Sequence, residues 1–219
     1  MIIAVDGPAG AGKSTVAKIL ASKMGFLYID TGSMYRALTL KALDNEIDIK
    51  NIKKITDLAK KTKIDLIPTP QGPSKVLLDN KDVSLAIRQP RVTKFVSDVA
   101  KIGSVRKIMV NLQRKLGDAK DCVLDGRDIG TVVFPKADRK FFIDASFEER
   151  VNRRYKDLIN LNILDVSQKQ VAADLKNRDT IDSTRKVSPL KIAKDAIYID
   201  TTNLSIEQVV DKMQNYVIR

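Results

Sequence analysis

The sequence predicts an α/β fold in which a parallel sheet carries helices on both faces. Short apolar segments alternate with helical patterns along most of the 219-residue chain, which is typical of strands joined by crossover helices. The first apolar segment, residues 2–5, also runs directly into a glycine-rich stretch that a helical pattern follows. In a parallel sheet such a turn lies at the carboxyl end of its strand, where ligands bind.

The expected elements follow this alternation along the chain. In the first part we expect a strand at 2–6, a helix at about 13–24, a short strand at 26–29 that ends in Asp30, and a helix at about 33–45. In the last part we expect strands at 122–124, 140–143 and 196–199, a helix opened by the capping-box-like Ser146-Phe147-Glu148-Glu149, and a closing helix at about 205–217.

Two stretches interrupt the alternation. Between about 64 and 88, short apolar runs flank the Pro- and Gly-rich residues 68–73, which predicts a small antiparallel insertion. From about 155 to 186 the chain is rich in Arg, Lys and Asp and too polar for a core, so we interpret it as a mobile flap, a helical lid. We find no internal repeat and expect one core with two appendages.

Residues 7–14 read G-P-A-G-A-G-K-S, which matches the phosphate-binding pattern G-x4-G-K-S/T. The glycines let the backbone curl so that successive N–H groups point inward, and the next helix adds the positive end of its dipole. Lys13 can then reach terminal phosphate oxygens, and the Ser14 hydroxyl can bind a Mg²⁺ that bridges them. We therefore expect a nucleoside triphosphate site on a P-loop NTPase-type sheet, rather than a structural glycine-rich turn.

Composition excludes several chemistries and compartments. The chain has no histidine, so triads and zinc sites built on imidazole are excluded. The single cysteine, Cys122, lies in an apolar run and is expected to be a buried, inert thiol in a reducing compartment. The sequence shows neither a cleavable leader pattern nor an apolar stretch long enough for a bilayer. We therefore expect a cytoplasmic protein that binds no membrane.

The formal net charge of +12 attracts anionic partners and by itself is compatible with nucleic-acid binding. Much of the excess, however, is Lys on amphipathic helical patterns, as at residues 50–63, where a solvated face is the simpler interpretation. Aromatic residues make up only 5% of the chain and Trp is absent, which leaves few platforms for stacking bases. We therefore expect no nucleic-acid partner.

Two polar segments should emerge at the same edge of the sheet as the glycine-rich loop. Asp125-Gly126-Arg127-Asp128 follows the strand at 122–124, where an acid can hold Mg²⁺ through water and Arg127 can neutralise a transferring phosphoryl group. A turn with a local ion pair is the alternative. Segment 30–36 follows the strand at 26–29, and its Arg36 can bind a phosphate in a bidentate manner. Capping of the next helix by Thr31 or Ser33 would explain those hydroxyls without a function.

A third segment, 178–185, repeats charges at helical spacing. Arg178 and Asp182 are four residues apart and Asp182 and Arg185 three, so they line one face. The alternative is an exposed ion-pair ladder of little energetic value, and it applies equally to the arginines at 150, 153 and 154.

Together these features favour a kinase whose acceptor is itself a phosphate. The oxygens of such an acceptor are already anionic at pH 7, so a chain without histidine can perform the reaction. The reaction requires alignment, charge neutralisation and exclusion of water. A phosphate loop, several arginines and a flap can supply these.

The same segments resemble those of bacterial cytidylate kinases over nearly the whole chain. The most particular matches are Gly-Arg-Asp-Ile-Gly-Thr-Val-Val-Phe-Pro at 126–135, Arg-Asp-x-x-Asp-Ser-x-Arg at 178–185, and the insertion near 64–88. The resemblance implies an enzyme of three parts: a core at about 1–35, 104–150 and 187–219, a monophosphate-binding domain with the insertion at about 36–103, and a lid at about 151–186.

The resemblance also implies the reaction and its residues. The γ-phosphoryl group of ATP would pass to CMP or dCMP with Mg²⁺, in a monomer whose partners are these small molecules. The residues that act on the transferred group would be Lys13, Arg36, Arg127 and Arg185. The ATP site would comprise Gly7, Pro8, Ala9, Gly10, Ala11, Gly12, Lys13, Ser14, Thr15 and the lid residues Arg150, Arg153 and Arg154, with Ser14 on the metal.

The acceptor site would be divided among base, ribose and phosphate. It would comprise Ser97, Arg106 and Asp128 at the cytosine with Arg185 beside them, Tyr35, Arg178 and Asp182 at the ribose, Arg36 and Arg127 at the phosphate, and Thr31. A carboxylate such as that of Asp128 can accept a hydrogen bond from the exocyclic amine of cytosine, which uracil lacks.

Three alternative functions remain open. Another P-loop kinase, acting on AMP, dTMP or a metabolite hydroxyl, would differ in its acceptor. A GTP-binding switch needs Asn-Lys-x-Asp for guanine, whereas Asn80-Lys81 is followed here by Asp82-Val83, so the pattern fails. A nucleic-acid-binding module would have to bind at physiological salt through its net charge.

Overall fold

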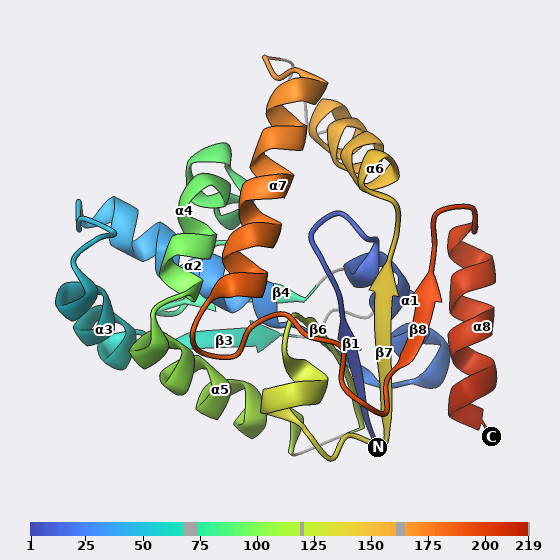
Figure 1. Ribbon diagram of the computed structural model, residues 1–219. Coiled ribbons are helices and arrows are strands. Elements are labelled where there is room, and N and C mark those ends of the chain that lie inside the picture. The colour runs from blue at the N-terminus through green and yellow to red at the C-terminus, as the bar shows by residue number, and fades with distance from the viewer. Residues whose placement is uncertain (68–73, 119–120, 161–164, 219) are drawn as a thin grey trace.

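The central sheet of the protein has five strands in the order β2-β6-β1-β7-β8, seen in a computed structural model that describes residues 1–67, 74–118, 121–160 and 165–218 (Figure 1). The strands are β1 (Ile2–Asp6), β2 (Leu27–Asp30), β6 (Cys122–Gly126), β7 (Arg139–Asp144) and β8 (Ile197–Asp200). All four pairings between these neighbours are parallel. The carboxyl ends therefore meet at one edge, as predicted.

Both faces of this sheet are covered, because successive side chains of a strand point to opposite faces. Ile3 and Val5 of β1 pack with helices α1 (Lys13–Met24) and α8 (Ile206–Ile218). Ala4 packs on the other face, with residues of α5 (Gly103–Gly117) and of a π-helical turn, η2 (Ile129–Val133). Strands buried in this way need apolar residues on both sides, which accounts for the short continuous apolar runs in the sequence.

A second group of elements packs beside the sheet and has a core of its own (Figure 1). Its helices are α2 (Thr31–Asp44), α3 (Ile52–Lys61), the 3-10 turn η1 (Ala86–Arg88), α4 (Pro90–Ala100) and part of α5. A small antiparallel sheet completes it, with strands β3 (Ile64–Ile67), β4 (Lys75–Leu78) and β5 (Lys81–Asp82). The predicted antiparallel insertion is confirmed, although its Pro- and Gly-rich turn at 68–73 lies outside the described residues.

Helices α6 (Phe147–Asn160) and α7 (Gln168–Thr184) stand beyond the carboxyl ends of the strands (Figure 1). Ser167 begins α7 with a reciprocal capping box, in which its side chain accepts from the Gln170 N–H and the Gln170 side chain accepts from the Ser167 N–H. The two helices share a small apolar cluster that includes Val171 and Leu175. The stretch expected to form a flap is thus largely helical, apart from residues 161–164, which are not described.

Element bounds follow the sequence expectation closely, with one informative difference. Helix α1 spans the predicted residues, whereas α2 begins at Thr31 rather than Ser33. Its N-cap is Asp30, whose carboxylate accepts a hydrogen bond from the Ser33 N–H at 2.9 Å. The hydroxyls of Thr31 and Ser33 therefore do not cap this helix.

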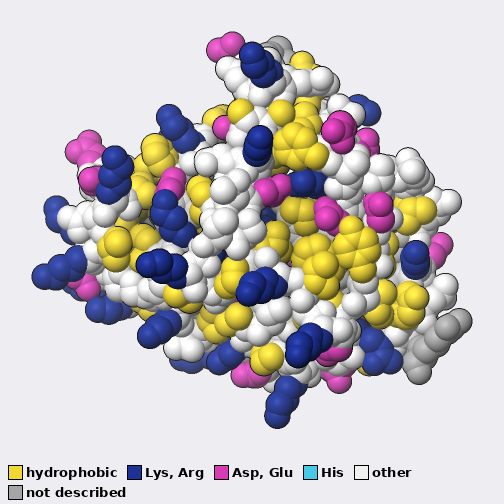
Figure 2. All heavy atoms as spheres, viewed as in Figure 1, with side chains coloured by type: hydrophobic (Ala, Val, Ile, Leu, Met, Phe, Trp, Pro, Cys, Tyr) yellow, Lys and Arg dark blue, Asp and Glu magenta, His cyan; other side chains and the backbone are white. Residues whose placement is uncertain are grey.

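The surface agrees with the interpretation of solvated lysine faces. Figure 2 shows Lys and Arg side chains spread over the outline of this face, with Asp and Glu among them, rather than gathered in one continuous patch. Cys122 is fully buried, and burial raises the pKa of its thiol to about 11, so it is a poor nucleophile. Within the described ranges no helix combines the length and the apolar character that a bilayer crossing needs.

Candidate active site

The loop between β1 and α1 needs glycine because neighbouring backbone leaves no space for a side chain. Gly7 has φ +147°, and a Cβ at this position would lie 2.0 Å from the carbonyl oxygen of Ile143 in β7. Lys13 Nζ donates to the Pro8 carbonyl oxygen at 2.5 Å, which closes the loop. Gly12 stands at the N-cap of α1 and supplies no side-chain cap, so the first N–H groups of this helix remain available to an anion.

The cations around this loop are crowded. Burial lowers the pKa of Lys13, and the nearby Arg127 lowers it further. Burial and Arg127 also lower the pKa of Arg178 to about 10, and burial and Arg178 lower that of Arg36 to about 9. The Nε atom of Arg178 is buried and has no hydrogen-bond partner among the described residues. A ligand with several negative charges would relieve this repulsion, which is what a nucleotide polyphosphate offers.

Oxygen ligands gather at the first turn of α1. Ser14 Oγ donates to Asp125 Oδ2 at 2.6 Å, and the Tyr28 hydroxyl donates to Asp125 Oδ1 at 2.9 Å. Burial raises the pKa of Asp125, and the neighbouring Asp30 carboxylate raises it further. A divalent cation would offset both charges, so these oxygens fit Mg²⁺. The described residues contain no cluster of three or more His, Cys, Asp or Glu side chains placed to hold a metal.

Further along the cleft, three arginines and two aspartates form a chain of alternating charges. Arg106 Nη2 lies 2.5 Å from Asp128 Oδ2, and Arg185 Nη2 lies 3.7 Å from Asp128 Oδ1. Arg185 Nη1 is 3.3 Å from Asp182 Oδ1, whose other oxygen accepts from Arg127 Nε at 3.0 Å. Both carboxylates are buried, and each lies between two arginines. This series of ion pairs runs from Arg106 to Arg127, which lies near Lys13 of the phosphate loop.

Asp6, at the carboxyl end of β1, positions the segment that contains Asp128. Its two carboxylate oxygens accept from the N–H groups of Ile129 and Gly130, each at 2.8 Å. These N–H groups begin the π-helical turn directly after Asp128, so Asp6 fixes where that turn starts. Nothing in the sequence pattern marks Asp6 for this role, because its partners are more than 120 residues away.

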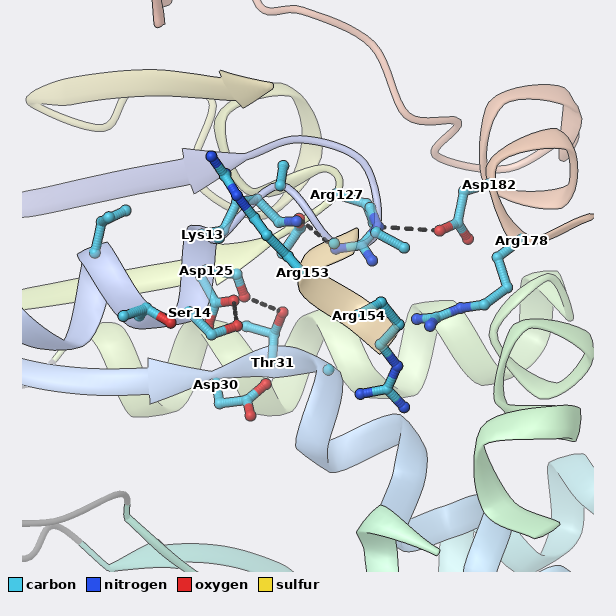
Figure 3. A pocket seen from close by; sticks show the side chains of 18 of the residues that line it. Lys13, Ser14, Asp30, Thr31, Asp125, Arg127, Arg153, Arg154, Arg178 and Asp182 are labelled. Carbon is cyan, nitrogen blue, oxygen red and sulfur yellow. Dashed lines mark hydrogen bonds and ion pairs between the residues drawn. The ribbon is translucent and has the colours of Figure 1, made fainter. Parts of the chain in front are cut away.

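Most of the predicted site residues line one cleft of about 650 Å³. The lining set includes Ala9, Gly10, Ala11, Gly12, Lys13, Ser14, Thr15, Thr31, Tyr35, Arg36, Ser97, Arg106, Arg127, Asp128, Arg153, Arg154, Arg178, Asp182 and Arg185. Figure 3 shows Lys13, Ser14 and Asp125 in one part of it, Arg178 and Asp182 in another, and Arg127 between Lys13 and Asp182.

Three predicted residues do not line this cleft: Gly7, Pro8 and Arg150. Gly7 and Pro8 shape the loop from behind. Arg150 was expected to bind donor phosphates, and here its guanidinium donates to the main-chain oxygens of Ala9 and Ala145 and to Asp179. The expected role of Arg150 beside Arg153 and Arg154 stays a prediction.

Tyr35 lines the cleft, and its hydroxyl has no hydrogen-bond partner among the described residues. The hydroxyl is buried, and burial raises its pKa to about 12. The guanidinium of Arg106 lies over the ring, 5.3 Å from its centroid.

Sequence reasoning missed a group of cleft residues at the carboxyl end of β8. Thr201, Leu204, Ser205 and Ile206 line the cleft, and Arg153 donates to Thr201 Oγ1 at 2.9 Å. A signal was present, since the carboxyl end of the strand expected at 196–199 had to reach the same sheet edge. Arg88 and Asp157 also line the cleft, and no local motif marks them.

The loop, the sheet and the two helices beyond its edge define the class: the protein has the fold of a P-loop kinase. Among solved structures, an uncharacterized protein from Eubacterium ventriosum aligns with a TM-score of 0.53 at 15% identity, covering 100% of this chain and 98% of that one. A shikimate kinase from Bacteroides thetaiotaomicron aligns with a TM-score of 0.51 at 11% identity, covering 100% and 99%. At these identities the likeness concerns the fold alone.

The family within this class follows from sequence comparison. A family model described as cytidylate kinase matches residues 3–219. A cytidylate kinase of Caldanaerobacter subterraneus subsp. tengcongensis is 51% identical over 96% of this chain and 92% of its own length, and that of Bacillus subtilis is 49% identical over 96% and 93%. The chain belongs to the cytidylate kinase family.

Proposed function

We propose that this chain phosphorylates CMP, and also dCMP, with ATP as donor, by direct in-line transfer of the γ-phosphoryl group in the presence of Mg²⁺. The relatives named for this activity are about half identical to this chain, and the alignments cover nearly their full length. One observation carries the proposal: a single cleft joins the phosphate loop to the buried Arg106–Asp128 pair. Every group that the reaction needs belongs to one chain, so we propose that the protein is a monomer. We also propose that it acts in the cytoplasm.

The donor would occupy the side of the cleft formed by α1 and the end of β8. Its phosphates would lie on the loop N–H groups and Lys13, with Arg153 and Arg154 reaching from α6. The apolar side chains of Leu204 and Ile206 offer a face for the adenine ring. Ser14, with Asp125 close by, would hold Mg²⁺, which offsets charge on the β- and γ-phosphates.

The acceptor would occupy the opposite side. The Asp128 carboxylate would accept from the exocyclic amine of cytosine, while Arg106 and Ser97 meet the other polar atoms of the base. Arg36 and Arg127 would hold the acceptor phosphate, and Asp182 with Arg178 would meet the ribose. In this arrangement the acceptor oxygen faces the γ-phosphoryl group across the space that Arg127 borders.

The chemistry then depends on charge and alignment. No general base is required, because the acceptor oxygen is already anionic. Lys13, Arg127 and Arg36 would neutralise charge that spreads over the transferring group, and a site closed by α6 and α7 would keep water from competing as acceptor.

The experiment is a coupled assay of ADP formation from ATP with CMP, dCMP, UMP, AMP and dTMP. We expect kcat/KM for CMP to exceed that for AMP or UMP by at least about tenfold, since uracil and adenine cannot satisfy Asp128 and Arg106 together. Equal kcat/KM with UMP or AMP would show that the proposed acceptor is wrong. The proposed roles of Ser97, Arg106 and Asp128 at the base would then fail as well.

A further inference from the structure

Arg150 of α6 and Asp179 of α7 meet on one residue of the phosphate loop, Ala9. Arg150 Nη1 donates to the Ala9 carbonyl oxygen at 3.0 Å and to Asp179 Oδ2 at 2.5 Å. The N–H of Ala9 donates to Asp179 Oδ1 at 3.3 Å. Both main-chain polar groups of Ala9 are therefore held by one ion pair, and the two charges come from two different helices.

Most of this contact is buried, although the Asp179 side chain keeps 23% of its exposure. Arg150 is 8% exposed and Ala9 is 3% exposed, and the methyl group of Ala9 packs in the apolar cluster of Val171 and Leu175 from α7. Arg150 Nε also donates to the Ala145 carbonyl oxygen at 3.2 Å. Removing either charge would leave buried polar groups without partners, which is costly in such surroundings.

The loop and α6 also approach each other closely in their backbones. Gly10 has φ +80°, and a Cβ there would lie 3.0 Å from the Arg150 carbonyl oxygen. The N–H groups that would receive phosphate belong to this same loop. Their direction therefore depends on how α6 and α7 are seated.

The same two helices present cations to the cleft. Arg178, the sequence neighbour of Asp179, lines the cleft, and so do Arg153 and Arg154, one turn beyond Arg150. Each helix thus contributes one residue that holds the loop from behind and another that faces the ligand in front.

We propose that Arg150 and Asp179 are positioning residues that fix the Ala9 peptide, and through it the phosphate loop, for ATP. Neither side chain touches a substrate. They act as one unit and tie the binding of ATP to the seating of α6 and α7 on the loop. This inference rests on the proposed function only in taking ATP as the donor.

The test compares Arg150→Ala, Asp179→Ala and the double variant. The Kd of ATP is measured by calorimetry without any acceptor, and KM is measured for ATP and for CMP. We expect each single variant to weaken ATP by about tenfold while KM for CMP stays within about twofold. The double variant should bind ATP no more weakly than the worse single variant, because the two residues form one unit.

Conservative and control variants keep the test independent of folding. Asp179→Asn retains an oxygen for the Ala9 N–H but loses the charge that orients Arg150, so its loss of ATP affinity should be partial. Asp211→Asn removes a carboxylate of similar chemistry from an exposed pair with Lys23, and it should leave both KM values unchanged. Thermal melts of all variants show that they are folded.

Three results would overturn the proposal: unchanged ATP affinity in Asp179→Asn and in the alanine variants, equal weakening of ATP and CMP, or additive losses in the double variant. A wrong acceptor leaves this test intact, because ATP binding is measured in the absence of any monophosphate.

Discussion

Arg127 is the residue at which the two sides of the cleft meet. Its Nε donates to Asp182 on the proposed acceptor side, and its charge lowers the pKa of Lys13 on the proposed donor side. A cation in this place adds little to a ground state already crowded with positive charge. It contributes most when negative charge spreads between the two nucleotides.

Arg127→Ala should therefore lower kcat by at least about 100-fold, with smaller changes in KM. Lys13→Ala should do the same, since both side chains act mainly on charge in the transition state. The coupled assay measures the rates, and circular dichroism checks the fold. Turnover close to that of the wild type in either variant would contradict the mechanism.

Asp182 lies between Arg127 and Arg185, so it could be only a structural link between them. If it also binds the acceptor ribose, Asp182→Ala should raise KM for CMP by about tenfold and change KM for ATP by much less. Steady-state titration of each substrate at saturation of the other provides the comparison. Equal losses for CMP and ATP would leave Asp182 with the structural role alone.

Asp6 should give the protein a measurable pH dependence. Burial raises its pKa from 3.8 to about 6, although the N–H groups of Gly130 and Ile129 lower it. The folded carboxyl group thus holds its proton more tightly than the unfolded one. The stability this confers is complete below about pH 4 and is lost as the pH rises through 6.

Relative to Asp6→Asn, the wild type should therefore lose up to about 3 kcal/mol of unfolding free energy between pH 4 and 6, and little above pH 7. Urea unfolding of both proteins across this range measures the difference, and other titrating groups cancel in it. A difference that is flat, or that grows with pH, would show that Asp6 does not titrate in this way.

At the scale of elements, the sequence predicted what local pattern determines. The glycines and Lys13 predict both the loop and the start of α1, and the apolar runs predict the strands. Capping of α2 by Thr31 or Ser33 was left open as an alternative because Asp30, Thr31 and Ser33 are all good cap residues, and only the backbone geometry selects Asp30.

Long-range partners set the limit of that prediction. Arg150 was grouped with Arg153 and Arg154 on the family resemblance, and its partner Asp179 lies on another helix. Asp6 and Tyr28 carry no local signal for bonding to segments near residue 125. The predicted domain boundary near residue 103 stays a prediction, since α5 contributes side chains to the cores on both sides of it.

The phosphate loop offers a test at this scale. Gly7→Ala should abolish ATP binding and destabilise the protein by more than about 2 kcal/mol, because the added Cβ would meet the Ile143 carbonyl oxygen of β7. Gly25→Ala is the matched control. Gly25 also has positive φ, at +69°, but a Cβ there would meet nothing within 4 Å, so only about 1 kcal/mol should be lost.

Chemical denaturation and ATP titration of the two variants give the comparison. A Gly7→Ala variant as stable as Gly25→Ala, with normal ATP affinity, would show that the loop can move away from β7. The account of why this loop is rich in glycine would then fail.

At the scale of the whole molecule, the proposed binding of two nucleotides depends on where the charges lie more than on the net charge. The net charge of +12 is spread over helix faces, whereas the arginines that matter converge from α2, α5, α6, α7 and the segment after β6 on one cleft. The parallel sheet explains the convergence, because its carboxyl edge collects loops that are far apart in the sequence. Two nucleotides could then lie end to end without an intermediate carrier on the protein.

That central claim can be tested by the stereochemistry of transfer. ATP made chiral at the γ-phosphorus with oxygen isotopes is used to phosphorylate CMP, and the configuration of the product is determined. A single in-line displacement between two nucleotides in one cleft predicts inversion at phosphorus. Retention would require two displacements through a phosphorylated side chain, and it would contradict the account.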